Sequence, residues 1–189
     1  MESKGPRIAV LGCGYWGKNL VRNFRDLGSL DLVCDVAAEG CVKAKELAPR
    51  VRCSQTFETA FEDPAIDGVV LATPAETHES LTIAALKAGK HVYVEKPMAL
   101  TVGQGIRMQA YASENKRILM VGHILEFHPA VLKLRELIRD NILGKVRYIY
   151  SNRLNFGKIR TEENALWSFA PHDIAVILRL FGDNPIEVT

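Results

Sequence analysis

A glycine-rich run, GCGYWG from Gly12 to Gly17, has the residue types and spacing of a phosphate-binding turn. It follows a short apolar run and precedes apolar residues at helical spacing, which is the context of a dinucleotide site. Gly12 would permit the tight turn, Gly14 would let the backbone approach a pyrophosphate, and Gly17 would let the helix pack closely. Tyr15 and Trp16 complete the loop and are expected beside the same cofactor. The alternative is a strand–turn–helix that is merely glycine-rich.

A carboxylate, Asp35, stands 18 positions after Gly17, near the end of the next expected strand. There it could accept hydrogen bonds from the adenosine ribose hydroxyls and would repel a 2′-phosphate. The three residues that follow it are apolar and cannot pair with a phosphate. The sequence therefore predicts NAD rather than NADP, with a solvated strand-end carboxylate as the alternative.

Polar residues also close two later strands. Thr73 and Pro74 end one of them, His78 lies in the first turn of the next helix, and Glu95 and Lys96 end another. Ligands bind at the carboxyl ends of strands in open sheets, so we expect all five residues near the cofactor. The ammonium of Lys96 could orient a substrate hydroxyl and lower the pKa of that hydroxyl. The alternatives are a surface-exposed His78 and an ordinary surface lysine.

Alternating strands and helices position these residues. Strands separated by helices of about 10 to 15 residues predict an α/β fold with a parallel, doubly wound sheet, here an NAD-binding Rossmann domain over residues 1–123. Strands are expected at 7–11, 30–36, 51–53, 68–73, 91–95 and 118–122, and helices at 20–27, 38–48, 56–61, 77–88 and 102–115.

Residues 124–189 have a different pattern. We expect a helix over 129–141, a long strand over 146–156, a polar loop over 157–164, a helix over 172–181 and the start of a strand at 186–189. One long strand and one nascent strand do not form a stable sheet. This segment is therefore predicted to be the start of an incomplete, truncated α+β substrate and oligomerisation domain.

Composition excludes several classes of protein. The formal net charge is +2, and apolar residues interrupt the few basic clusters, which argues against a nucleic-acid surface. No apolar run is long enough for a membrane span, and the first residues lack the apolar core of a signal peptide. The four cysteines form no CxxC pair and no zinc spacing, so we expect no metal site. Cys13 and Cys34 lie in or beside expected buried strands, as reduced thiols of a cytoplasmic protein would.

Five segments together resemble the glucose–fructose oxidoreductase / inositol dehydrogenase (Gfo/Idh/MocA) family: GCGYWG, ATPAETH, VEKP, GHILEFHP and ENALWSFAPHD. The resemblance runs over the whole chain, and the EKP tripeptide at its distance from the glycine loop is its most specific part. It implies oxidation of a sugar or polyol hydroxyl, or the reverse reduction, with a nicotinamide cofactor. It also implies a second domain with a large open sheet that covers the active site and often forms oligomers.

The same resemblance implies a catalytic pair. The family commonly uses the lysine of EKP and a histidine of the second domain, and Lys96 and His172 match these positions. Ser168 stands where an aspartate often precedes that histidine, and Asp173 follows it instead. His172 would be the general base for the hydroxyl that loses hydride. The alternative is a helix-capping or core-edge histidine.

The run NRLNFGKIRTEENALWSFAPHD is most similar to the subgroup that acts on nucleotide-linked N-acetylhexosamines, including 3-dehydrogenases of UDP-N-acetylglucosamine or its uronate. Glu126 is a departure, because many relatives carry a basic residue in that segment. Lys96, His172 and four side chains of this run are expected to bind the substrate, the arginines through phosphate or carboxylate. These four are Arg153, Asn155, Arg160 and Asn164, and a solvated loop is their alternative.

The expected function is therefore hydride transfer between NAD and a sugar hydroxyl, within a homo-oligomer when full length, and without nucleic-acid or membrane partners. A dehydrogenase of a free sugar or a polyol such as inositol is one alternative. A non-catalytic NAD-binding sensor or remnant is another. The presence of Lys96 and His172 together favours an enzyme, because a binding module would not need both.

Overall fold

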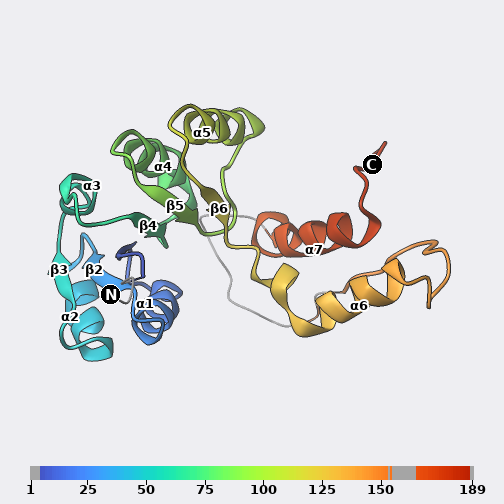
Figure 1. Ribbon diagram of the computed structural model, residues 1–189, viewed down its shortest axis with the longest axis horizontal. Coiled ribbons are helices and arrows are strands. Elements are labelled where there is room, and N and C mark those ends of the chain that lie inside the picture. Colours follow the sequence, from blue (N-terminus) through green and yellow to red (C-terminus); the bar gives the residue numbers. More distant parts are fainter. Residues whose placement is uncertain (1–4, 153, 155–164, 188–189) are drawn as a thin grey trace. The chain divides into compact units, whose positions relative to one another are not determined.

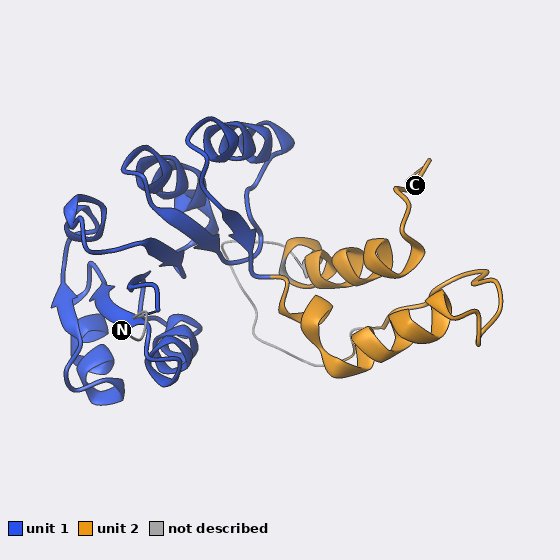
Figure 2. Cartoon of the chain, viewed as in Figure 1, with its two compact units in different colours: residues 1–122 blue, residues 123–189 orange. Residues whose placement is uncertain are grey.

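The computed structural model of the protein describes residues 5–152, 154 and 165–187. The chain divides into two compact units, Met1–Gly122 and His123–Thr189 (Figure 2). The first unit contains every strand found among the described residues, and the second contains only helices as regular elements. In the described part of the chain, no helix is both long and apolar enough to cross a membrane.

A six-stranded parallel sheet forms the centre of the first unit (Figure 1). Its strand order is β3-β2-β1-β4-β5-β6, so the chain winds one way from β1 and then the other way from β4. This confirms the predicted doubly wound α/β fold, with the switch point between β1 and β4. The strands are β1 (Ile8–Leu11), β2 (Leu30–Cys34), β3 (Arg52–Ser54), β4 (Gly68–Leu71), β5 (His91–Val94) and β6 (Leu119–Val121).

Helices cover both faces of this sheet. Buried residues of α1 and α2 belong to one apolar cluster, and those of α3, α4 and α5 belong to a second cluster. Figure 1 shows α1 and α2 apart from α4 and α5, with the strands between them. The helices are α1 (Gly17–Asp26), α2 (Ala38–Leu47), α3 (Glu58–Glu62), α4 (His78–Lys87) and α5 (Val102–Glu114), with a short 3-10 helix η1 (Ala75–Thr77) before α4.

The central strands read as unbroken apolar runs because both of their faces are buried. In β1, Ala9 and Leu11 pack in the cluster under α4 and α5, while Val10 packs in the cluster under α1 and α2. Val69 and Val70 in β4 alternate in the same way. The sheet is therefore a rigid support on which the loops at the strand ends are held.

The cysteines are free thiols. Cys13 and Cys34 are buried, as predicted from their places in or beside the strands. Burial raises the pKa of the Cys34 thiol to about 12. A thiol with this pKa stays protonated near neutral pH and behaves as a small apolar side chain.

The second unit consists of a short 3-10 helix η2 (Ile124–Phe127), α6 (Pro129–Arg139) and α7 (Ala165–Phe181). The ring of His128 caps α6, where its Nδ1 accepts from the amide of Ala130 at 3.2 Å. The helix α7 packs against η2 and α6. Glu126 of η2 lies 3.8 Å from the guanidinium of Arg179 in α7, so the acidic departure noted in the sequence has a basic partner within this unit.

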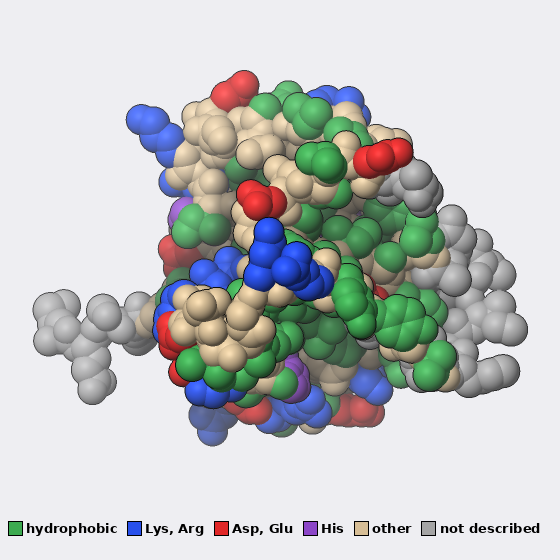
Figure 3. Space-filling model, turned by 90° about the vertical axis from the view of Figure 1, so that its right-hand side faces the viewer, with side chains coloured by type: hydrophobic (Ala, Val, Ile, Leu, Met, Phe, Trp, Pro, Cys, Tyr) green, Lys and Arg blue, Asp and Glu red, His purple; other side chains and the backbone are tan. Residues whose placement is uncertain are grey.

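Exposed apolar side chains are frequent in the second unit. Ile142, Tyr148, Tyr150 and Ile174 are each more than half exposed. Figure 3 shows hydrophobic side chains at many points on one face of the molecule, among basic and acidic ones. Apolar groups exposed in such numbers are typical of a surface that contacts other protein.

Three expectations for the second unit are wrong. The strand expected over 146–156 is absent from residues 146–152 and 154, which have no regular structure, and the strand expected at 186–189 is absent from residues 186 and 187. An alternating sequence becomes a strand only when a neighbouring strand completes its backbone hydrogen bonds. The helix expected from residue 172 begins at Ala165 and contains Pro171. Proline is favoured in the first turn of a helix, but Pro171 lies in the interior of α7, so it does not mark the start of this helix.

Truncation of a buried side chain should destabilise the first unit. Met108 of α5 is fully buried in the cluster against β4 and β5, whereas Ile106 of the same helix is 60% exposed. Met108→Ala should lower the free energy of unfolding by about 2–5 kcal/mol, since it removes packed atoms and leaves a cavity. Ile106→Ala is the matched control and should change stability little. Urea unfolding measures both, and equal effects would contradict this description of the core.

Candidate functional site

The glycine loop between β1 and α1 has two positions that only glycine can occupy. Gly12 has a φ of +92°, and a Cβ there would lie 2.8 Å from the carbonyl oxygen of Ala72. A Cβ on Gly17 would lie 2.0 Å from the carbonyl oxygen of Gly12. Gly14 is exposed and a Cβ there would meet no atom within 4 Å, so the open space beside it is available to a ligand.

The start of α1 is suited to an anion. Its N-cap residue, Trp16, forms no side-chain capping hydrogen bond, and the first turn contains no acidic residue. The amino end of a helix carries partial positive charge and amide groups that bind phosphate. Together with the open side of Gly14, this arrangement fits the pyrophosphate of a dinucleotide.

Asp35 follows β2 and is held by the backbone. Its Oδ2 accepts from the amide of Cys13 in the glycine loop at 2.6 Å, and its Oδ1 accepts from the amide of Ala37 at 2.9 Å. A carboxylate oxygen has a second lone pair, so each oxygen can still accept a ribose hydroxyl. A Cβ on Gly40 of α2 would lie 2.2 Å from Cγ of Asp35. Gly40 is thus a site residue that the sequence analysis missed, although a glycine early in a helix is a signal of close approach.

Glu95 joins the glycine loop to the end of β5. Its buried carboxylate accepts from the indole Nε1 of Trp16 at 2.8 Å and from the hydroxyl of Tyr93 at 3.1 Å, both through Oε1. Its Oε2 accepts from the amide of Lys96 at 3.3 Å. Trp16 and Glu95, which the sequence predicts near one cofactor, are therefore in direct contact.

Two neighbours of Glu95 were not foreseen. Burial, followed by the charge of Glu95, raises the pKa of the Tyr93 hydroxyl far above its usual range, so Tyr93 remains a hydrogen-bond donor. Gly122 follows β6, and a Cβ there would lie 2.6 Å from the Tyr93 hydroxyl and 2.9 Å from Oε2 of Glu95. A larger residue at position 122 would displace the carboxylate.

His78 is neither exposed nor open to a ligand. Its side chain is 1% exposed. Its Nδ1 lies 2.8 Å from the carbonyl oxygen of Pro97, and its Nε2 lies 3.0 Å from the carbonyl oxygen of Thr73. In this structure the ring of His78 contacts backbone carbonyl groups inside the unit, and neither ring nitrogen is open for the predicted contact with the cofactor.

The other predicted residues of the first unit lie at the same edge of the sheet. Thr73 and Lys96 are partly buried, and Pro74 and Tyr15 are exposed. The hydroxyl of Thr73 accepts from the hydroxyl of Thr77 at 2.7 Å. These positions follow the carboxyl ends of β1, β4 and β5, where open α/β sheets bind ligands.

His172 belongs to the second unit. It lies in the middle of α7, with Ser168 one turn before it in the chain. Its ring centroid is 6.4 Å from that of His123, and the two rings meet edge to face. Asp173 accepts from the hydroxyl of Ser151 at 3.0 Å. Four of the six predicted substrate residues lie outside the described residues: Arg153, Asn155, Arg160 and Asn164.

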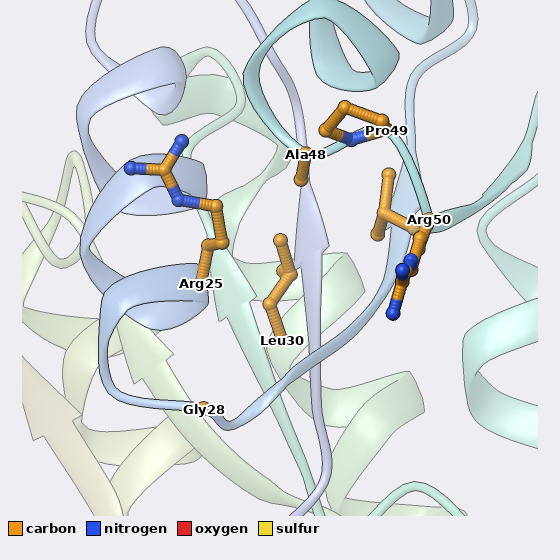
Figure 4. A pocket seen from close by; sticks show the side chains of 7 residues that line it. Arg25, Gly28, Leu30, Ala48, Pro49 and Arg50 are labelled. Carbon is orange, nitrogen blue, oxygen red and sulfur yellow. The ribbon is translucent and has the colours of Figure 1, made fainter.

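A cavity of about 360 Å³ lies at the opposite edge of the sheet (Figure 4). It is bounded by the end of α1, the start of β2 and the segment between α2 and β3, with Leu30 between Arg25 and Arg50. This edge carries the amino end of β2 and no residue that the sequence predicts for the site. We therefore locate the candidate site at the carboxyl ends of the strands.

Comparison with known proteins agrees with this geometry. Residues 6–123 match the oxidoreductase family with an NAD-binding Rossmann fold. The chain is 30% identical, over 96% of its length and 56% of the relative, to a UDP-N-acetylglucosamine 3-dehydrogenase of Acidithiobacillus ferrooxidans. It is 33% identical, over 75% of its length and 42% of the relative, to an inositol 2-dehydrogenase of Acidothermus cellulolyticus.

A solved structure extends the comparison. The WlbA dehydrogenase of Bordetella pertussis in complex with NADH and UDP-GlcNAcA has a TM-score of 0.67 and 27% identity, over 73% of this chain and 43% of that one. The first unit is thus a nicotinamide-dinucleotide domain. The chain belongs to the Gfo/Idh/MocA oxidoreductase family, as its motifs predict, and the cofactor of this domain is NAD. It spans about half the length of the curated relatives it matches.

The contact between Gly40 and Asp35 gives a direct test of the ribose site. Gly40→Ala should displace the carboxylate and weaken NADH binding by about tenfold, equivalent to about 1.4 kcal/mol. Gly105→Ala in α5 is the matched control, because a Cβ there meets nothing within 4 Å. Fluorescence titration with NADH measures both variants. If Gly40→Ala bound NADH with wild-type affinity, the placement of the Asp35 carboxylate would not depend on the absence of a side chain at position 40.

Proposed function

We propose that the complete protein is an NAD-dependent sugar dehydrogenase acting on a nucleotide-linked amino sugar. The observation that carries this proposal is the hydrogen bond between Trp16 of the glycine loop and Glu95, because it holds the residue before Lys96 against the cofactor loop. A lysine fixed in this way is suited to chemistry beside a bound dinucleotide. The family match supports the same reaction class.

When bound, NAD supplies the hydride acceptor, and the protein supplies orientation and electrostatics. The glycine loop and the start of α1 would hold the pyrophosphate, and Asp35 would hold the adenosine ribose. The ammonium of Lys96 would donate a hydrogen bond to the reacting hydroxyl and lower the pKa of that hydroxyl. His172 would then remove the hydroxyl proton while the carbon loses hydride.

Two observations favour a nucleotide sugar as the substrate. One relative is named for UDP-N-acetylglucosamine, and one structural neighbour was solved with UDP-GlcNAcA. Arg153 and Arg160 would pair with phosphate or carboxylate, and Asn155 and Asn164 with hydroxyls. A polyol such as inositol is the second candidate, because an inositol 2-dehydrogenase is 33% identical to the chain.

In this proposal residues 124–189, which fall within the second unit, form the start of the substrate domain. Its exposed apolar side chains would pack against the rest of that domain or against another subunit of a homo-oligomer. We propose a cytoplasmic location, where the four free cysteines would remain reduced. A non-catalytic NAD-binding protein would not require Lys96 and His172.

Cofactor preference is testable on this chain. Asp35 should repel the 2′-phosphate of NADP, so NADH should bind more tightly than NADPH by at least about tenfold. Asp35→Ala should reduce the difference in affinity between NADH and NADPH. Asp26→Ala is the control, because it removes the same charge at the far end of α1. Competitive titration with both cofactors measures the ratio, and tighter binding of NADPH to the wild type would overturn the assignment.

The catalytic pair is testable in a full-length form of the protein. His172→Ala should lower single-turnover NADH formation by about 10²- to 10⁴-fold and leave NAD affinity nearly unchanged. Lys96→Ala should lower turnover and also weaken sugar binding, because an ammonium binds the ground state as well. Lys133→Ala on α6 is the control for a lost surface charge.

The substrates should include UDP-N-acetylglucosamine, its uronate and inositol, so that the two candidate classes are compared directly. A His172→Ala protein that turns over at the wild-type rate would exclude this residue as the base. Activity with inositol but with neither nucleotide sugar would show that the substrate is a polyol and not a nucleotide sugar.

A further inference from the structure

His78 is a buried polar residue with two backbone partners in separate segments. It begins α4, and its ring reaches the carbonyl oxygen of Thr73, two residues after β4, at 3.0 Å. It also reaches the carbonyl oxygen of Pro97, three residues after β5, at 2.8 Å. The ring therefore connects two loops at the carboxyl edge of the sheet.

The residue between Glu95 and Pro97 is Lys96, and its backbone is held on both sides. On its amino side, its amide donates to Oε2 of Glu95 at 3.3 Å. On its carboxyl side, the carbonyl of the next residue faces Nδ1 of His78. We propose that His78 is a positioning residue for Lys96, which fixes the lysine backbone through the Pro97 carbonyl. The catalytic value of this role rests on the proposed function of Lys96.

The chemistry of the ring favours this role over simple packing. Both carbonyl oxygens can only accept and a neutral ring has one N–H, so the proposed role assigns that N–H to Nδ1 at the Pro97 contact. An apolar side chain of similar size would fill the space but leave buried acceptors without this donor. Burial to 1% exposure also excludes a direct contact between the ring and a dinucleotide.

The helix that carries His78 is itself anchored. Glu79, the next residue of α4, pairs with Arg107 of α5 at 2.6 Å. Farther along α4, Ala85 and Leu86 are fully buried in the core under the sheet. The ring therefore projects from a fixed support, and its contact with Pro97 can restrain the segment that contains Lys96.

Two conservative variants separate the two contacts of the ring. The side-chain nitrogen of asparagine lies close to the position of Nδ1, and that of glutamine close to the position of Nε2. His78→Asn should keep a donor for Pro97, whereas His78→Gln should keep one for Thr73. Thr82→Val is the matched control, because Thr82 lies one turn farther along α4, is fully buried and its hydroxyl has no partner among the described residues.

Hydrogen–deuterium exchange of the cofactor-free chain is the first measurement. In His78→Gln, the amides of Glu95, Lys96 and Met98 should exchange about tenfold faster than in wild type, and His78→Asn should restore most of the protection. Thr82→Val should leave this segment unchanged. Equal exchange in His78→Gln and Thr82→Val would overturn the positioning role, whatever the enzyme does.

Kinetics of the full-length protein are the second measurement. His78→Gln should lower kcat by about tenfold with unchanged NAD affinity, and His78→Asn should recover most of the rate. Faster exchange at residues 95–98 with an unchanged kcat would support the positioning of Lys96 and contradict its catalytic role. Failure of the proposed function is thereby distinguished from failure of this inference.

Discussion

The geometry of the site depends on the hydrogen bonds that the carboxylate of Glu95 accepts. A buried charge is tolerated only when it is fully hydrogen-bonded, and this one accepts from the indole of Trp16, the hydroxyl of Tyr93 and the amide of Lys96. These donors come from the glycine loop, from β5 and from the segment after β5. The cofactor loop and the candidate catalytic lysine cannot shift independently while these bonds hold.

Asp35 is held in a similar way at the other side of the glycine loop. Its oxygens accept from two backbone amides, and a glycine in the neighbouring helix leaves room for it. Glu95 likewise faces Gly122, where a Cβ would contact its Oε2. In both places a carboxylate is oriented by donors on one side and by the absence of a side chain on the other. This explains why glycines outside the phosphate-binding turn contribute to the site.

The sequence predicted the features that depend on local pattern. The unbroken apolar runs, the helical spacing and the context of the glycine loop identified the fold, the family and the place of Asp35 and Lys96. It did not predict the contacts that depend on distant segments, such as Gly40 against Asp35 or the ring of His78 against Pro97. Its error over residues 146–152 and 154 has the same cause, because alternation specifies a strand only where a neighbouring strand exists.

The hydrogen bonds within the first unit also affect which residue could act as the general base of the proposed reaction. Asp35 and Glu95 are acceptors committed to nearby donors, and both nitrogens of His78 face carbonyl oxygens. A proton on Asp35 or Glu95 would remove the negative charge that these donors stabilise, and the ring of His78 is only 1% exposed. Among the predicted site residues of that edge, Tyr15, Thr73 and Lys96 remain, and an ammonium at Lys96 would be a donor. The proposal that the base is His172 of the second unit rests on the motifs, and this distribution agrees with it. Ser168 stands one turn before His172 in the chain, so that position supplies no full negative charge for an imidazolium.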